Sequence, residues 1–157
     1  MECPAALSLH VVQYIYTAVS SFQGESLFDS RILLARYVSI TDYDVYEISV
    51  GANSNTLTWI RSGIGGLVLA QKATSNILHC THSQWLWVDW SRRGIAVGTG
   101  PFVGDSVLLS VGTLPQQFDI SAITVATGES ADGFWEFATI PGLCTDICMF
   151  SLLTVLF

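Results

Sequence analysis

Residue types suited to ligand binding are concentrated in one stretch, Ser83–Gly100, with the sequence SQWLWVDWSRRGIAVGTG. It holds three tryptophans within six residues, then Arg92 and Arg93, then a run of glycines. A tryptophan beside two arginines can stack on a sugar ring or hold a carboxylate. A glycine run after a strand can instead bind a phosphate or S-adenosylmethionine, provided that a helix begins directly after it.

The strand around the tryptophans favours core packing for two of them. Alternate residues of a strand share a face, so Trp85 and Trp87 lie on one side and Trp90 on the other. Both sides are largely apolar, which is typical of a strand covered on both faces. Trp90 borders the polar turn that holds Arg92 and Arg93. These three residues are therefore candidate ligand-binding residues, with an ordinary solvated turn as the alternative.

The glycines of Gly98–Gly104, GTGPFVG, are expected in turns and bulges. A nucleotide-type site requires a helix after the glycine loop. Pro101 and the following DSVLLSVG indicate a turn and another strand, so no βαβ unit can be built there. The residues themselves therefore predict no cofactor and no catalytic residue.

Metal-ligating residues do not form a recognisable pattern. His79 and His82 flank Cys80, but a strand sends neighbouring side chains to opposite faces. Asp42 and Asp44 lack the dense oxygen spacing of a calcium loop and are expected in a solvated turn. The four cysteines are Cys3, Cys80, Cys144 and Cys148. They form no CxxC pair, so we expect the cysteines to be small buried residues. One disulfide is possible if the chain is secreted.

Overall charge and hydropathy exclude some classes of partner. The net charge is −7 and only six residues are lysine or arginine, whereas nucleic acid requires a basic face. Glu2, His10 and Gln13 argue against a signal peptide. The apolar tail CMFSLLTVLF is too short to span a bilayer, so no membrane span is expected. Compartment stays open between cytosol and cell exterior.

Short strand-like segments separated by Gly, Asn, Ser and Pro dominate the chain. This spacing predicts an all-β protein, an antiparallel two-sheet β-sandwich of jelly-roll type with little or no helix. We expect one domain over residues 1–141, and a tail over 142–157 that is a last strand, a truncated segment or a sequence artefact. Periodicity leaves Arg31–Val38 open between strand and helix. With it, the ten expected segments are Leu9–Val19, Arg31–Val38, Val45–Gly51, Thr56–Arg61, Gly66–Gln71, Gln84–Trp90, Gly94–Gly98, Ser106–Gly112, Phe118–Thr127 and Gly133–Ile140.

One hairpin can be predicted residue by residue. A turn centred near Asn53–Ser54 in GANSN makes Ile48 face Ile60 and Glu47 face Arg61. An apolar pair and an ion pair follow from one register, which supports it. A β-sandwich that binds a ligand through its loops would expose this turn. Asn53 and Asn55 are therefore added to the candidate ligand-binding residues.

Three motifs resemble the farnesoic acid O-methyltransferase domain family. They are YEISVGANSNTLTWIR (Tyr46–Arg61), WVDWSRRGIAVGTG (Trp87–Gly100) and GFWEF (Gly133–Phe137). Their order and spacing also match, and the resemblance covers about residues 9–141. The motif residues are interpreted as fold determinants: Tyr46, Glu47, Gly51, Arg61, Trp87, Gly94, Gly98, Gly100 and Trp135.

The resemblance implies two different functions. The family name refers to methylation of farnesoic acid to methyl farnesoate, with S-adenosylmethionine as methyl donor, in juvenile-hormone synthesis. A similar domain also occurs as a module of larger, often extracellular invertebrate proteins, including lectin-like ones. We favour a non-catalytic recognition module for a glycan, a small ligand or a protein. The alternatives are the methyltransferase, whose substrate is a small apolar acid, and a purely structural domain.

Overall fold

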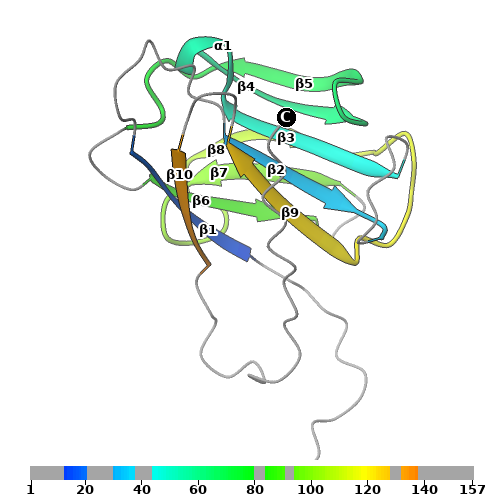
Figure 1. The fold of residues 1–157 in the computed structure, drawn as a ribbon. Coiled ribbons are helices and arrows are strands. Elements are labelled where there is room, and N and C mark those ends of the chain that lie inside the picture. Colours follow the sequence, from blue (N-terminus) through cyan, green and yellow to red (C-terminus); the bar gives the residue numbers. More distant parts are fainter. Residues whose placement is uncertain are drawn as a thin grey trace, which may run out of the picture.

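A computed structural model describes residues 13–20, 30–37, 44–79, 84–90, 94–127 and 132–137. The predicted all-β, two-sheet antiparallel sandwich is confirmed (Figure 1). Among the described residues, no helix is long and apolar enough to cross a membrane. The strands are β1 (Gln13–Ser20), β2 (Ser30–Ala35), β3 (Val45–Gly51), β4 (Leu57–Ser62), β5 (Leu67–Ala73), β6 (Gln84–Asp89), β7 (Ile95–Thr99), β8 (Val107–Val111), β9 (Ala122–Thr127) and β10 (Asp132–Phe137).

The two sheets are built mainly from strands that are consecutive in the sequence. Sheet A has the order β10-β1-β6-β7-β8, and sheet B has the order β5-β4-β3-β2-β9. Strands β2 to β5 form one antiparallel meander and β6 to β8 form another. The edge strands β5 and β8 contact each other across the sandwich, so one side of the molecule is an edge-to-edge seam.

The core lies between the sheets and follows the two-residue period of the strands. In sheet B every second residue points inward, as in Tyr46, Ile48 and Val50 of β3, each at most 1% exposed. Opposite them, Leu86 and Val88 of β6 belong to the same buried cluster. Further members of this cluster are Ile32, Leu34, Ile60, Leu78, Ile95, Val97, Leu109, Leu114 and Val125.

The β3–β4 hairpin has the predicted register. Glu47 pairs with Arg61 and Ile48 with Ile60. The connecting element, labelled α1 (Ala52–Asn55), is a left-handed turn, because Asn53, Ser54 and Asn55 have φ of 49°, 58° and 61°. Asparagine adopts this conformation more readily than most residues, which explains the Asn-rich turn. Gly51, with φ of 73°, begins the turn where a Cβ would lie 2.6 Å from Leu78 Cδ1.

Trp87 is buried on the outer face of sheet A, away from the main core. The ring is 1% exposed, and its Nε1 donates to the Asp105 carbonyl at 2.7 Å. Asp105 belongs to the β7–β8 connection, which therefore folds back over the sheet. Gly98, the strand neighbour of Trp87, leaves room for the indole: a Cβ there would lie 2.3 Å from Trp87 Cζ2. Trp85, on the same face, is only partly buried.

The remaining motif residues also lie in or beside strands. Gly94 directly precedes β7, where a Cβ would lie 2.4 Å from the Val111 carbonyl oxygen. Gly100 follows β7 with φ of 112° and packs against Asp105. Trp135 lies in β10 and pairs with Thr17 of β1. The tail over 142–157, and with it the proposed domain boundary, lies outside the described residues.

Tyr46 connects sheet B to the β8–β9 loop. Its buried hydroxyl is expected to make the stability of the domain depend on pH. Its hydroxyl donates to the Gln116 carbonyl and accepts from the Gln116 N–H at 3.2 Å, and its ring stacks on Phe118 at 5.2 Å between centroids. Burial raises the pKa of Tyr46 above its ordinary value of 10.0.

The unfolded chain therefore loses this proton at a lower pH than the folded chain. The stability contributed by the neutral phenol is complete below about pH 10 and falls as the pH rises toward the folded-state pKa. Urea unfolding of the wild type and of Tyr46→Phe between pH 8 and about pH 11 measures this. We expect the difference in free energy of unfolding between the two proteins to become smaller above about pH 10. If this difference stays constant with pH, the raised pKa of Tyr46 is wrong.

Candidate functional site

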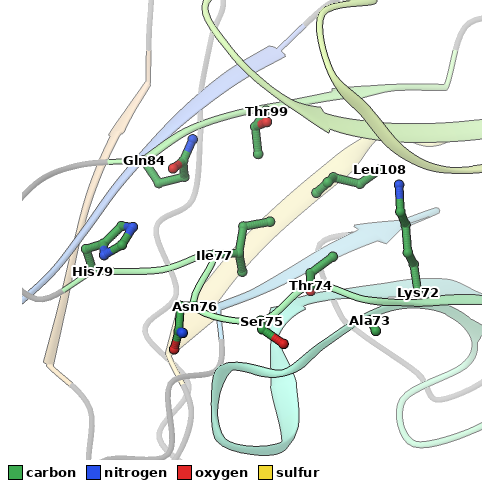
Figure 2. Close-up of a pocket in the computed structure, with 10 residues that line it drawn as sticks. All are labelled: Lys72, Ala73, Thr74, Ser75, Asn76, Ile77, His79, Gln84, Thr99 and Leu108. Carbon is green, nitrogen blue, oxygen red and sulfur yellow. The ribbon is translucent and has the colours of Figure 1, made fainter.

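An open cleft of about 340 Å³ lies at the seam between the edges of the two sheets (Figure 2). Sheet B contributes the end of β5 and the loop that follows it. Sheet A contributes the start of β6, the end of β7 and the start of β8. The lining residues are Lys72, Ala73, Thr74, Ser75, Asn76, Ile77, His79, Gln84, Thr99 and Leu108.

The wall formed by residues 74–79 is fixed by Asn55. Asn55 is 5% exposed, and its Nδ2 donates to the Leu78 carbonyl at 2.8 Å. Its Oδ1 accepts from the Leu78 N–H at 3.0 Å, and its own carbonyl accepts from the Asn76 N–H at 2.8 Å. The side-chain amide thus pairs with the wall as a neighbouring strand would.

A second anchor lies at the start of the same wall. The Thr74 N–H donates to the Thr56 carbonyl at 2.8 Å. The hydroxyls of Thr74 and Thr58, both buried, are hydrogen-bonded at 2.8 Å. The wall is therefore tied to the β3–β4 hairpin at both ends by hydrogen bonds within the protein.

The cleft combines neutral hydrogen-bonding groups with a small apolar surface. Asn76 and Gln84 supply amides, and the Gln84 Nε2 is oriented by a 3.1 Å hydrogen bond to the Trp85 carbonyl. Ile77 and Leu108 supply the apolar part and pack against the core behind it. Ser75 and Thr99 add hydroxyls to this lining.

Two basic side chains also line the cleft. Lys72 is exposed and His79 is partly buried. Lys72 is the only lysine in the chain. A negatively charged group on a ligand therefore has a cation available, in a protein whose net charge is −7.

The candidate ligand-binding residues predicted from the sequence do not come together in one site among the described residues. Trp90 is partly buried and packs against the core; it follows the end of β6 opposite to Gln84. Arg92 and Arg93 lie outside the described residues. Asn53 is exposed and donates to Thr56 Oγ1 at 3.3 Å within its own turn. Asn55, as shown above, uses its side chain to hold the cleft wall.

Sequence reasoning did not find the cleft. The only local signal was the polar loop Thr74–Asn76 between a strand and the buried Leu78, and such a loop is common on any surface. What makes it a wall is its position opposite Thr99 and Leu108 of sheet A, which depends on how the two sheets pack.

The glycine loop and the candidate metal ligands form no recognisable ligand site within the described residues. The loop after Gly98 leads into strand β8, as predicted, and not into a helix. Among the described residues, no group of three His, Cys, Asp or Glu is placed to hold a metal ion. His79 and Asp44 are described, whereas Cys80, His82 and Asp42 lie outside the described residues.

The fold and the site define an antiparallel β-sandwich with a cleft between the edges of its two sheets. The profile of the farnesoic acid O-methyltransferase family matches residues 14–139, most of the chain. The chain belongs to this family. Comparisons with curated proteins and with solved structures found no match.

Proposed function

We propose that this domain is a non-catalytic recognition module that binds a small hydroxyl-rich ligand, such as a sugar, in the cleft between β5 and β8. The observation that supports this most is the lining itself. The amides of Asn76 and Gln84 line the same cleft as the apolar side chains of Ile77 and Leu108. A sugar ring has polar edges and an apolar C–H face, and so requires both kinds of surface in one place.

The dimensions and rigidity of the cleft support the same proposal. A volume near 340 Å³ is at the small end of ligand sites, which range over about 300–1,000 Å³. The hydrogen bonds from Asn55 fix one wall in advance, so less conformational entropy is lost on binding. The seam is also open, which suits a ligand that is one unit of a longer glycan.

The family description supports a second candidate, methylation of an apolar carboxylic acid. In the same cleft, the Lys72 ammonium would pair with the carboxylate and Ile77 and Leu108 would contact the hydrocarbon chain. The two proposals differ in what must bind: the methyltransferase requires S-adenosylmethionine and the recognition module does not. The glycine loop leads into a strand, which favours the recognition module.

The single lysine provides a direct test of both candidates. Reductive methylation with ¹³C-formaldehyde labels Lys72 and the α-amino group and keeps the positive charge. A glycan array selects the sugars, and titration of each into the labelled chain should shift the dimethyl-Lys72 signal in a saturable way. Gln84→Ala should then weaken binding about tenfold, through loss of one hydrogen bond.

Arg36→Gln is the matched control, because Arg36 is exposed and does not line the cleft. It should leave the affinity unchanged. A saturable Lys72 shift with S-adenosylmethionine or farnesoic acid, together with methyl farnesoate formation, would establish the methyltransferase instead. If the sugar binds but only Trp90→Ala weakens it, the ligand site is the β6–β7 hairpin and the cleft proposal fails.

A further inference from the structure

We infer that the outer face of sheet B holds a second site, which binds an oxyanion, a carboxylate or sulfate group, beside Arg61 and Trp59. This site is distinct from the cleft, which lies at the seam of the two sheets. It is built from strands β2, β3 and β4 at the centre of sheet B.

The register of sheet B places the residues of this site next to one another. Arg31 pairs with Ser49, and Ser49 pairs with Trp59. In the adjacent row of side chains Glu47 pairs with Arg61. All five are odd-numbered residues whose even-numbered neighbours form the core, so their side chains emerge on the outer face.

Three of these side chains have a buried polar atom without a hydrogen-bond partner. The atoms are Trp59 Nε1, Arg61 Nε and Ser49 Oγ, and Ser49 is 0% exposed. Buried polar groups are nearly always hydrogen-bonded, so three neighbouring exceptions require a reason. An indole N–H and a guanidinium N–H can only donate, and the missing partner is therefore an acceptor.

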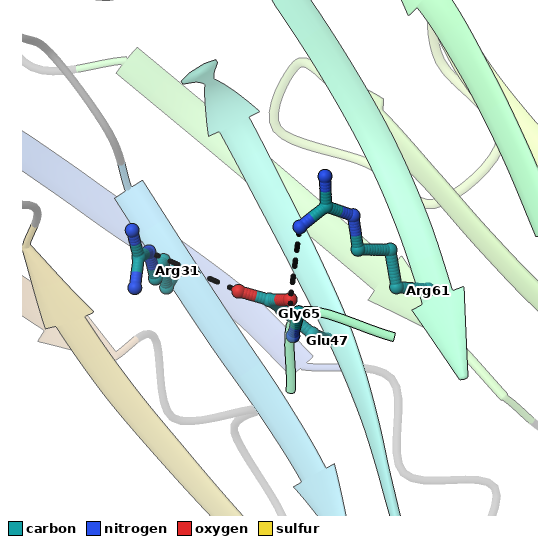
Figure 3. A network of polar contacts seen from close by, with 4 residues as sticks. All are labelled: Arg31, Glu47, Arg61 and Gly65. Atoms are coloured by element: carbon teal, nitrogen blue, oxygen red, sulfur yellow. Dashed lines mark hydrogen bonds and ion pairs between the residues drawn. The ribbon is translucent and has the colours of Figure 1, made fainter. Parts of the chain in front are cut away.

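Glu47 does not supply that acceptor. Its Oε2 accepts from the Gly65 N–H at 2.9 Å, but Arg61 Nη1 lies 3.8 Å from Oε2 and Arg31 Nε lies 3.9 Å from Oε1 (Figure 3). Charge-assisted hydrogen bonds measure about 2.7–2.9 Å, so these ion pairs are about 1 Å too long to be hydrogen-bonded. Arg61 Nε therefore keeps no acceptor on this face, although its Nη1 lies near Glu47.

The arginines that border the site are partly exposed, although the donor atoms beneath them are buried. The side chains of Arg31 and Arg61 are 35% and 24% exposed, whereas Glu47 is 3% exposed. The Arg61 guanidinium carbon lies 4.1 Å from the centre of the Trp59 ring, so Arg61 covers the indole. Trp59 Nε1 and Arg61 Nε are buried, so the proposed site requires Arg61 to rotate across the ring before an anion oxygen can accept from both.

The indole N–H of Trp59 is the direct reporter. The full chain with ¹⁵N-labelled tryptophan is titrated with sodium sulfate or sodium acetate, at constant ionic strength maintained with sodium chloride. We expect a saturable downfield shift of the Trp59 indole proton, assigned by its loss in Trp59→Phe. The anion that saturates at the lower concentration identifies the group. The Trp87 indole is the internal control, because it already donates to Asp105 and should not move.

Two variants test the donors one at a time. Ser49→Ala removes a hydroxyl that has no partner, so it should leave the melting temperature unchanged or raise it, while raising the Kd about tenfold. Arg61→Lys keeps the charge but removes Nε–H and should also weaken binding. Neither variant should change binding in the cleft.

The inference is overturned if neither anion saturates the Trp59 signal, or if the Trp87 signal shifts in parallel, which indicates a general salt effect. It is also overturned if Ser49→Ala and Arg61→Lys both bind as well as the wild type. If Arg61→Lys fails to fold, Ser49→Ala alone decides. Because the cleft is tested by sugars and by Lys72, either site can fail while the other stands.

Discussion

Replacing Trp87 with alanine is expected to lower the free energy of unfolding by about 3–5 kcal/mol, the usual cost of truncating a buried tryptophan. The ring is 1% exposed and lies between sheet A and the β7–β8 connection. Its loss leaves a cavity and removes the hydrogen bond that holds the connection through Asp105. Urea unfolding monitored by far-ultraviolet circular dichroism gives the change directly.

Trp90→Ala is the control, because Trp90 is on the same strand segment but only partly buried. Trp90→Ala should lower the free energy of unfolding by less than Trp87→Ala does. Gly98→Ala provides a second check, since its Cβ would clash with the Trp87 ring. It should destabilise the wild type by about 1–3 kcal/mol and the Trp87→Ala protein less, because there only the 2.8 Å contact of the Cβ with the Asp105 carbonyl oxygen remains. Equal costs in both backgrounds, or equal costs for the two tryptophans, would show that the ring is not packed as described.

Asn55→Ala is expected to destabilise the domain by at least about 3 kcal/mol, although it removes only one small polar side chain. Two buried backbone groups of Leu78 lose their partner, at about 1–3 kcal/mol each. Alanine must also adopt φ near 61°, which costs about a further 1–2 kcal/mol. The measurement is again urea unfolding, with the dimethyl-Lys72 signal as a reporter of the cleft.

The same turn contains a matched control. Asn53 has φ of 49°, but it is exposed and its side chain bonds only within the turn. Asn53→Ala therefore introduces the same backbone strain and leaves the hydrogen bonds to the 74–79 wall intact. It should cost about 1–2 kcal/mol. Asn55→Gly relieves the strain and still loses both hydrogen bonds, so it should lie between the two. Equal stabilities of Asn53→Ala and Asn55→Ala would contradict the role given to Asn55.

The Asn55 variants also connect the stability of the hairpin with the ligand binding that we propose for the cleft. If Asn55 fixes the 74–79 wall, a destabilised but folded Asn55→Gly protein should bind its ligand more weakly without any change in the residues that contact the ligand. A structural turn residue is then indirectly a determinant of affinity.

The sequence by itself determined the hairpin register and most of the strands. Its strand bounds were wrong in two places: β2 ends at Ala35 and not at Val38, and β9 begins at Ala122 and not at Phe118. The pairing of Glu47 with Arg61 and of Ile48 with Ile60 follows from a short Asn-rich turn and a two-residue alternation, both of which are local. The opposite faces of Trp87 and Trp90 follow in the same way from strand geometry. These features require no knowledge of what lies beyond the neighbouring strand.

Only the tertiary structure decided what covers each face and where a cleft opens. Trp87 is buried on the outer face because the β7–β8 connection returns over it, and Asn55 is a wall anchor because Leu78 lies beside it. The cleft joins Lys72 and Asn76 of one sheet to Thr99 and Leu108 of the other. Such contacts depend on which strands become sheet edges and on how the sheets pack, and residue periodicity carries no information about either.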